Sequence, residues 1–172
     1  ALAIQNGGIY VDGTFGAGGY SRALLLAGDC VVVAIDRDPS VAPLASALAQ
    51  EFPDRLHLIN ASFGDMSELL PQAGFTAVDG VTFDLGVSSM QIDQAERGFS
   101  FQKDGPLDMR MGSSGPSAAD VVNNLSAEDL AAIFFYYGEE RRSRAVAKAI
   151  VAARVDAPIT RTLQLAKIVA GA

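Results

Sequence analysis

The sequence contains a single cysteine, Cys30, and a single histidine, His57, among its 172 residues. One cysteine excludes a disulfide framework and a thiolate zinc cluster, and we expect Cys30, which opens an apolar run, to lie in the core. His57 lies where a predicted strand begins, which favours a structural or exposed role. The sequence therefore predicts no metal site.

Long apolar runs are also missing. No segment approaches the roughly 18 apolar residues of a membrane span, and residues 1–6 lack the basic region and long apolar segment of a secretion signal. We therefore expect a soluble, cytoplasmic protein with no membrane partner. With 49% hydrophobic residues, the chain can bury a substantial core as one domain, or as one domain with an insertion.

Acidic residues outnumber basic ones, and the net charge of −7 by itself argues against a nucleic-acid partner. The charges are unevenly distributed, however. Residues 139–172 carry seven basic and three acidic side chains, whereas residues 1–138 carry six and seventeen. Such asymmetry can mark a surface that faces a polyanion. A solvated face of an amphipathic helix explains the same charges equally well.

A glycine-rich turn follows the first apolar run, residues 9–11. The pattern Gly16-x-Gly18-x-x-Ser21 leads into a predicted helix, so the segment is interpreted as a strand, a turn and a helix. Glycines there allow positive φ and let a ligand approach the N–H groups at the start of the helix. The pattern is degenerate, and an ordinary glycine-rich turn also fits it.

Two acids accompany this turn. Asp36 ends the second apolar run, 31–35, twenty positions after Gly16, where a carboxylate can accept both hydroxyls of a ribose. Dinucleotides and S-adenosylmethionine (AdoMet) both fit that arrangement. Asp12 favours AdoMet, because a carboxylate just before the glycines repels a pyrophosphate and attracts the amino and sulfonium groups of AdoMet. The alternative is that Asp12 only caps the turn.

Strand and helix patterns alternate as far as Asp84. Strands are predicted at 9–11, 31–35, 56–60 and 78–83, with helices beginning at 21, 41 and 66. This alternation is typical of a parallel α/β sheet with right-handed crossovers, in which ligands bind beyond the carboxyl ends of the strands. Asp12, Asp36 and Asp84 stand at three of those ends. Phe63, after the third strand, could stack on an adenine or pack in the core.

The stretch 85–111 has no clear periodicity, yet its apolar content argues against disorder. We interpret it as an ordered active-site loop. Its candidate site residues are polar or aromatic: Gln91, Asp108, Arg110, Phe99 and Phe101.

Residues 112–117 resemble a hinge, and helices are predicted beyond them. Capping patterns and charges place these helices at 117–125, 126–138, 139–155 and from 160 onward. The helix at 139–155 would have acids in its first turn and basic residues later. We predict an AdoMet-binding Rossmann-like core over 1–111 and a helical insertion over 112–172. Because no strand returns to complete the small sheet, we expect the chain to be a fragment.

Six motifs resemble those of the RsmH (MraW) family, the ribosomal RNA small subunit methyltransferase H family. They occupy residues 12–19, 34–39, 84–89, 95–101, 104–111 and 137–141. The resemblance implies a Rossmann-like methyltransferase domain interrupted by a helical substrate-recognition insertion. It also implies AdoMet-dependent methylation of the exocyclic N4 of a cytidine, with 16S ribosomal RNA or the small ribosomal subunit as partner.

The resemblance also implies site residues. Cofactor contacts are expected near the glycine turn, at the ribose and around the adenine: Asp12, Gly16, Gly18, Gly19, Tyr20, Asp36, Phe63, Asp84 and Gln91. The family commonly has histidine at Tyr20 and proline at Met90. Tyr20 can still offer its backbone N–H, so we expect the site to survive both departures.

For catalysis, Asp84 or Asp108 could accept a hydrogen bond from the exocyclic amine, which must be held in line with the methyl group. Two other functions remain open. An NAD-dependent oxidoreductase shares the glycine turn and Asp36 but leaves Asp12 and the loop unexplained. A non-catalytic RNA-binding fragment would rely on the basic helices alone.

Overall fold

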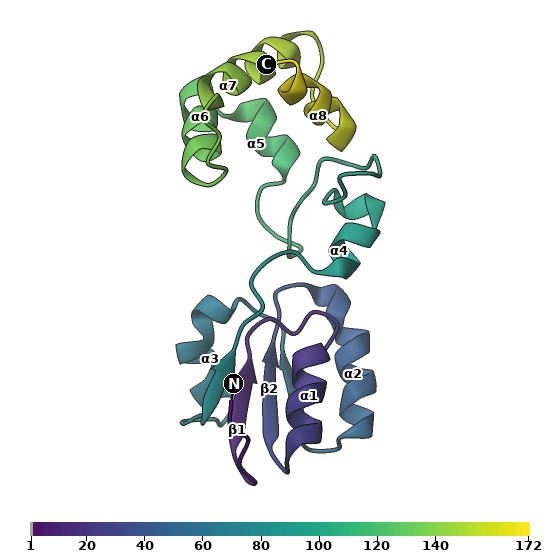
Figure 1. Ribbon diagram of the computed structural model, residues 1–172, viewed down its shortest axis with the longest axis vertical. Coiled ribbons are helices and arrows are strands. Elements are labelled where there is room, and N and C mark those ends of the chain that lie inside the picture. Colours follow the sequence, from purple (N-terminus) through teal and green to yellow (C-terminus); the bar gives the residue numbers. More distant parts are fainter. Residues whose placement is uncertain (1) are drawn as a thin grey trace. The chain divides into compact units, whose positions relative to one another are not determined.

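A computed structural model describes residues 2–172, and the chain divides into two compact units. The first unit comprises the residues up to Ser88 together with 111–113, and the second comprises 89–110 and 114–172. The first is an α/β unit and the second is helical (Figure 1).

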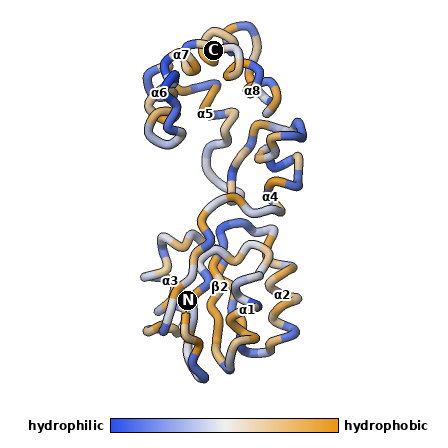
Figure 2. Tube along the Cα trace, in the orientation of Figure 1, coloured by the Kyte–Doolittle hydropathy of each residue, from blue (hydrophilic) through white to orange (hydrophobic). Residues whose placement is uncertain are grey.

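The α/β unit is built on a four-stranded parallel sheet. Its strands are β1 (Ile9–Asp12), β2 (Val31–Ile35), β3 (Leu56–Ile59) and β4 (Gly80–Thr82), in the order β3-β2-β1-β4. The predicted Rossmann-like arrangement of strands and crossover helices is confirmed. Its central strand β2 is hydrophobic along its length (Figure 2), as expected for a strand covered on both faces.

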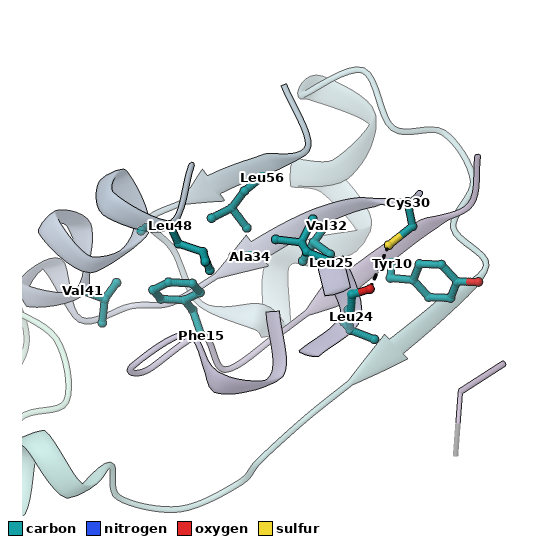
Figure 3. Close-up of a cluster of buried hydrophobic side chains, with 11 residues drawn as sticks. Tyr10, Phe15, Leu24, Leu25, Cys30, Val32, Ala34, Val41, Leu48 and Leu56 are labelled. Carbon is teal, nitrogen blue, oxygen red and sulfur yellow. Dashed lines mark hydrogen bonds between the residues drawn. The ribbon is translucent and has the colours of Figure 1, made fainter. Parts of the chain in front are cut away.

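Alternate residues of the strands face opposite layers. Tyr10, Val32 and Ala34 pack with helices α1 (Gly19–Ala27) and α2 (Ala42–Glu51), the latter preceded by a 3₁₀ turn. Cys30 lies in this cluster as expected, with its thiol directed at the Leu24 carbonyl (Figure 3).

The opposite face of the sheet carries Val11, Val33 and Ile35, which pack against Leu70 of α3 (Met66–Gln72). Helix α3 begins at Met66, as the sequence predicted, and ends at Gln72, one residue past Pro71. Burial of each of these side chains contributes about 1.5–3 kcal/mol. The two hydrophobic layers therefore hold the sheet between helices and fix the register of its strands.

The helical unit contains α4 (Ser89–Asp93), α5 (Ala118–Asn124), α6 (Ala127–Tyr136), α7 (Ser143–Asp156) and α8 (Thr162–Ala170), with a 3₁₀ turn after α4. Its core is formed by fully or almost fully buried side chains: Leu107, Val122, Leu130, Val146, Ala147, Ile150 and Ile159. None of the helices over residues 2–172 has the length and apolar character to cross a membrane.

Two serines begin helices of this unit as the capping patterns predict. The Ser117 hydroxyl accepts the Asp120 N–H, and the Asp120 carboxylate accepts the Ser117 N–H in return. The Ser126 hydroxyl likewise accepts the Asp129 N–H. Each cap satisfies N–H groups that have no partner inside the helix.

The predicted start of the long helix at residue 139 is wrong. Helix α7 begins at Ser143, and no acid lies in its first turn. Glu139 has φ of 51°, and the Glu140 N–H returns to the Phe134 carbonyl, so both residues close the end of α6 instead. The Glu140 carboxylate then accepts the Arg142 N–H just before α7.

The two compact units are delimited differently from the predicted functional division at residue 111, which stays a prediction. Residues 89–110 group with the helices. The reason lies in Leu107, whose side chain is buried in the helical core while its N–H donates to the Thr160 carbonyl. The neighbouring Asp104 carboxylate accepts the Arg161 side chain, which ties the loop to the start of α8.

Candidate functional site

The carboxyl ends of β1, β2 and β4 meet along one edge of the sheet. Asp12, the last residue of β1, is in register with Ala34 of β2 and Thr82 of β4. Beyond it the Gly13 N–H donates to the Thr82 carbonyl at 3.0 Å, and the Phe15 N–H donates to the Ile35 carbonyl at 3.2 Å. The glycine turn is therefore anchored to both neighbouring strands.

The turn takes the positive φ values expected of its glycines. Gly16 has φ of 52° and Gly18 has φ of 82°. A Cβ on Gly18 would also lie 2.8 Å from the Phe15 ring, which packs beneath the turn. Gly19 is the first residue of α1, and a Cβ there would meet no atom within 4 Å. The backbone at Gly19 is thus open to an approaching ligand.

Asp36 lies just beyond β2 and connects it to the glycine turn. One oxygen of its carboxylate accepts the Gly16 N–H at 2.8 Å, and the other accepts the Asp38 N–H at 2.9 Å. The Asp36 side chain is only partly buried. Since each carboxylate oxygen has two lone pairs, each retains one for an incoming hydroxyl.

Asp12 is fully buried. Its carboxylate accepts the Ser21 hydroxyl at 2.7 Å and the Thr14 N–H at 3.2 Å, so it ties the end of β1 to α1 across the turn. Burial raises the pKa of Asp12, and these hydrogen bonds oppose that rise. These contacts are those of the turn-capping interpretation, and they hold the carboxylate just before the glycines.

The exit of β4 is held to the same turn. The Asp84 N–H donates to the Thr14 hydroxyl at 2.7 Å, while the Asp84 side chain is exposed. Phe83 packs on Gly13, where a Cβ would collide with its ring, and lies 5.1 Å from the Phe63 ring between centroids. Phe63 is 38% exposed, so part of its ring is available for stacking.

Tyr20 is the second residue of α1, and its side chain is 51% exposed. N–H groups in the first turn of a helix have no partner inside that helix. At this position the backbone N–H can serve as a donor whatever the side chain is.

The remaining predicted residues all lie in the helical unit: Gln91, Phe99, Phe101, Asp108 and Arg110. Gln91 is buried in α4. Asp108 is engaged by Arg110, whose Nε and Nη2 atoms donate to its two oxygens at 2.9 and 2.6 Å. This contact with Arg110 lowers the pKa of Asp108 and keeps its carboxylate ionised.

The structure adds two residues that the sequence interpretation did not single out. Thr14 connects the exit of β4 to the turn through its hydroxyl, and Phe83 covers Gly13. The sequence signal for Thr14 was a hydroxyl residue two positions after Asp12, the acid that ends the first strand. Phe83 had a weaker signal, as the last apolar residue before Asp84.

Comparison with known proteins agrees with this geometry. The sequence matches the MraW methylase family over residues 1–172. The chain belongs to the MraW methylase family. The resemblance carried by the six sequence motifs is thereby confirmed.

Similar proteins in this family are named "Ribosomal RNA small subunit methyltransferase H". The protein of that name from Parvibaculum lavamentivorans is 64% identical over 169 residues, which are 98% of this chain and 50% of the relative. The one from Rhodospirillum rubrum is 58% identical over 171 residues, 99% of this chain and 52% of the relative. The chain therefore spans about half the length of the curated relatives it matches.

Proposed function

We propose that the protein is an AdoMet-dependent methyltransferase that modifies the exocyclic N4 of a cytidine in 16S ribosomal RNA, in the cytoplasm. The observation that carries this proposal is the pairing of Asp36 with the glycine turn in a member of the MraW methylase family. The relatives are named as methyltransferases of small-subunit ribosomal RNA, and these names support ribosomal RNA as the substrate.

The residues of the α/β unit fit AdoMet. Asp36 has lone pairs left for the two ribose hydroxyls, and Phe63 offers a partly exposed ring to the adenine. Gly16, Gly18 and Gly19 add no side chains to the turn, and a Cβ at Gly19 would meet no atom within 4 Å. Asp12, buried behind the turn, supplies a negative charge that suits a sulfonium and opposes a pyrophosphate.

When bound, AdoMet supplies an electrophilic methyl group. The amine of cytosine is a weak nucleophile because its lone pair is delocalised into the ring. The chain must therefore hold the amine in line and accept one of its hydrogens. Asp84 suits that role, since its exposed carboxylate stands at the exit of β4 while Thr14 holds its backbone. Asp108 is the second candidate, and Arg110 already occupies both of its oxygens.

Titration calorimetry of AdoMet and of NADH against the same chain tests the cofactor. We expect AdoMet to bind and NADH not to bind. The reverse result would favour an oxidoreductase, and failure of both ligands would leave an RNA-binding role.

Gln91 is expected to contribute to AdoMet binding as well, and Gln91→Ala should then weaken it.

Methyl transfer is measured separately. 16S RNA is incubated with labelled AdoMet and either this chain or the full-length protein, and the nucleosides are analysed by mass spectrometry. We expect N4-methylcytidine with the full-length protein. Its absence there would refute the assigned reaction, whatever the result of the cofactor titration.

A further inference from the structure

The helical unit carries a groove between α6 and the start of α7. Its volume is about 980 Å³. Part of its lining consists of small alanine side chains, including Ala131 and Ala132, which do not fill the space between the larger side chains. No element of the α/β unit contributes to this groove, which is therefore distinct from the edge of the sheet described above.

Cations dominate the charged residues of this groove. Four basic side chains line it: Arg141, Arg142, Arg144 and Lys148. All four are exposed, and within residues 2–172 none of them forms an ion pair with an acid. Glu128 is the acidic residue of the lining. A local excess of positive charge on a chain with net charge −7 is the feature of a surface that meets a polyanion.

Exposed aromatic rings accompany these cations. Phe135 and Tyr136 line the groove and are 53% and 75% exposed, and Tyr137, the next residue, is 88% exposed. The rings of Phe135 and Tyr136 meet edge to face, with their centroids 5.3 Å apart. The core of the unit is filled by other residues of α6, notably Leu130, so packing among residues 2–172 does not account for the Phe135 and Tyr136 rings.

We propose that the α6–α7 surface, formed by Phe135, Tyr136 and the four basic residues, binds single-stranded RNA. Aromatic faces stack on unpaired bases, and guanidinium and ammonium groups hold the phosphates between them. A duplex would engage the cations but has no free base faces for the rings. The inference rests on the proposed function in taking RNA as the polyanion, and it adds where and in which form RNA is held.

Tyr136 provides the decisive variant. Binding of a short fluorescein-labelled single-stranded RNA is followed by anisotropy for Tyr136→Leu and Tyr136→Phe, with circular dichroism melting to show that both fold. Tyr136→Leu removes the stacking face and should weaken binding about tenfold. Tyr136→Phe keeps the ring and should bind within about twofold of the parent. Equal affinity of all three proteins would overturn the proposal.

The charges are tested by a matched pair. Lys148→Glu changes a groove residue, whereas Lys167→Glu makes the same change of net charge on α8, outside the groove. Lys148→Glu should lower the affinity and flatten its dependence on salt, and Lys167→Glu should change both far less. Equal effects would mean that only net charge matters and would refute a defined site.

Competition decides between single strands and duplexes. Unlabelled single-stranded RNA should displace the probe at lower concentration than the same sequence annealed to its complement. Preference for the duplex would overturn the stacking role. These outcomes are independent of AdoMet: loss of AdoMet binding with RNA binding intact refutes only the cofactor, and the opposite pattern refutes only the α6–α7 surface.

Discussion

The carboxylate of Asp36 accepts the backbone N–H of Gly16, twenty positions earlier in the chain. The residue assigned to the ribose therefore also fixes the conformation of the turn beside it. Such dual use limits what a substitution at Asp36 can reveal, because loss of affinity can arise from a lost ligand contact or from a displaced turn. Asp36→Asn separates the two better than alanine, since it preserves size and one acceptor oxygen.

We expect Asp36→Asn to weaken AdoMet binding by about tenfold to a hundredfold, since a hydrogen bond to a charged group contributes about 1.5–3 kcal/mol. Calorimetry gives the affinity, and a thermal melt of the unliganded chain reports the state of the turn. Unchanged affinity in a folded variant would remove Asp36 from the cofactor site.

Gly18 and Gly19 make a matched pair for the turn. Gly18→Ala places a Cβ at φ of 82° and against the Phe15 ring, and should destabilise the chain by about 1–3 kcal/mol. Gly19→Ala introduces no clash and should leave stability unchanged or slightly higher. If AdoMet approaches the backbone here, Gly19→Ala should nevertheless weaken its binding. Denaturant unfolding and calorimetry measure the two effects, and full affinity in Gly19→Ala would place the ligand elsewhere.

Much of the fold could be predicted from the sequence because its signals are local. The apolar run of β2 and the serine caps of α5 and α6 depend on neighbours along the chain. The apolar runs also predicted where each strand ends. The spacing of twenty residues between Gly16 and Asp36 predicted that both lie at the same edge of the sheet. Their direct hydrogen bond was not predictable, because it depends on how far the turn folds over the end of β2.

Two boundaries could not be read from local patterns, because each depends on contacts that form only when the chain folds. Leu107 lies in a stretch without periodicity, and its burial in the helical core and its hydrogen bond to Thr160 are what group this stretch with the helices. Glu139 and Glu140 suggested the acidic first turn of a helix, but tertiary geometry uses Glu139 in a left-handed conformation to end α6. Charge patterns near helix ends do not distinguish the end of one helix from the start of the next.

Burial of Asp12 gives a prediction about pH. Because burial raises its pKa in the folded state, the folded chain binds this proton more tightly than the unfolded chain does. The stability that Asp12 contributes is therefore complete at low pH and is lost as pH rises from its ordinary pKa through the folded one. Asp12→Asn cannot ionise, so its stability relative to the parent should rise as pH increases from about 4. Urea unfolding across this range measures the difference, and a constant difference would contradict the raised pKa.

Thr14 should hold the exit of β4 in place through its hydroxyl. Thr14→Val removes the acceptor for the Asp84 N–H and should cost about 0.5–1.5 kcal/mol, with faster hydrogen exchange of the Asp84 amide. Thr14→Ser keeps the hydroxyl and should preserve the protection of that amide. Equal exchange rates in the two variants would show that the hydrogen bond does not hold this segment.

Leu107 tests whether residues 89–110 are part of the helical unit. Its side chain is 2% exposed within the helical core, so Leu107→Ala should destabilise that unit by about 2–5 kcal/mol through lost burial and the cavity left behind. Phe101, in the same stretch, is 94% exposed, and Phe101→Ala should change stability by no more than about 0.5 kcal/mol. Hydrogen exchange resolved by segment locates the effect: amides of α5 and α7 should lose protection in Leu107→Ala, while those of β1 and β2 should not. Loss confined to the sheet would instead assign the loop to the α/β unit, as the sequence boundary at residue 111 predicted.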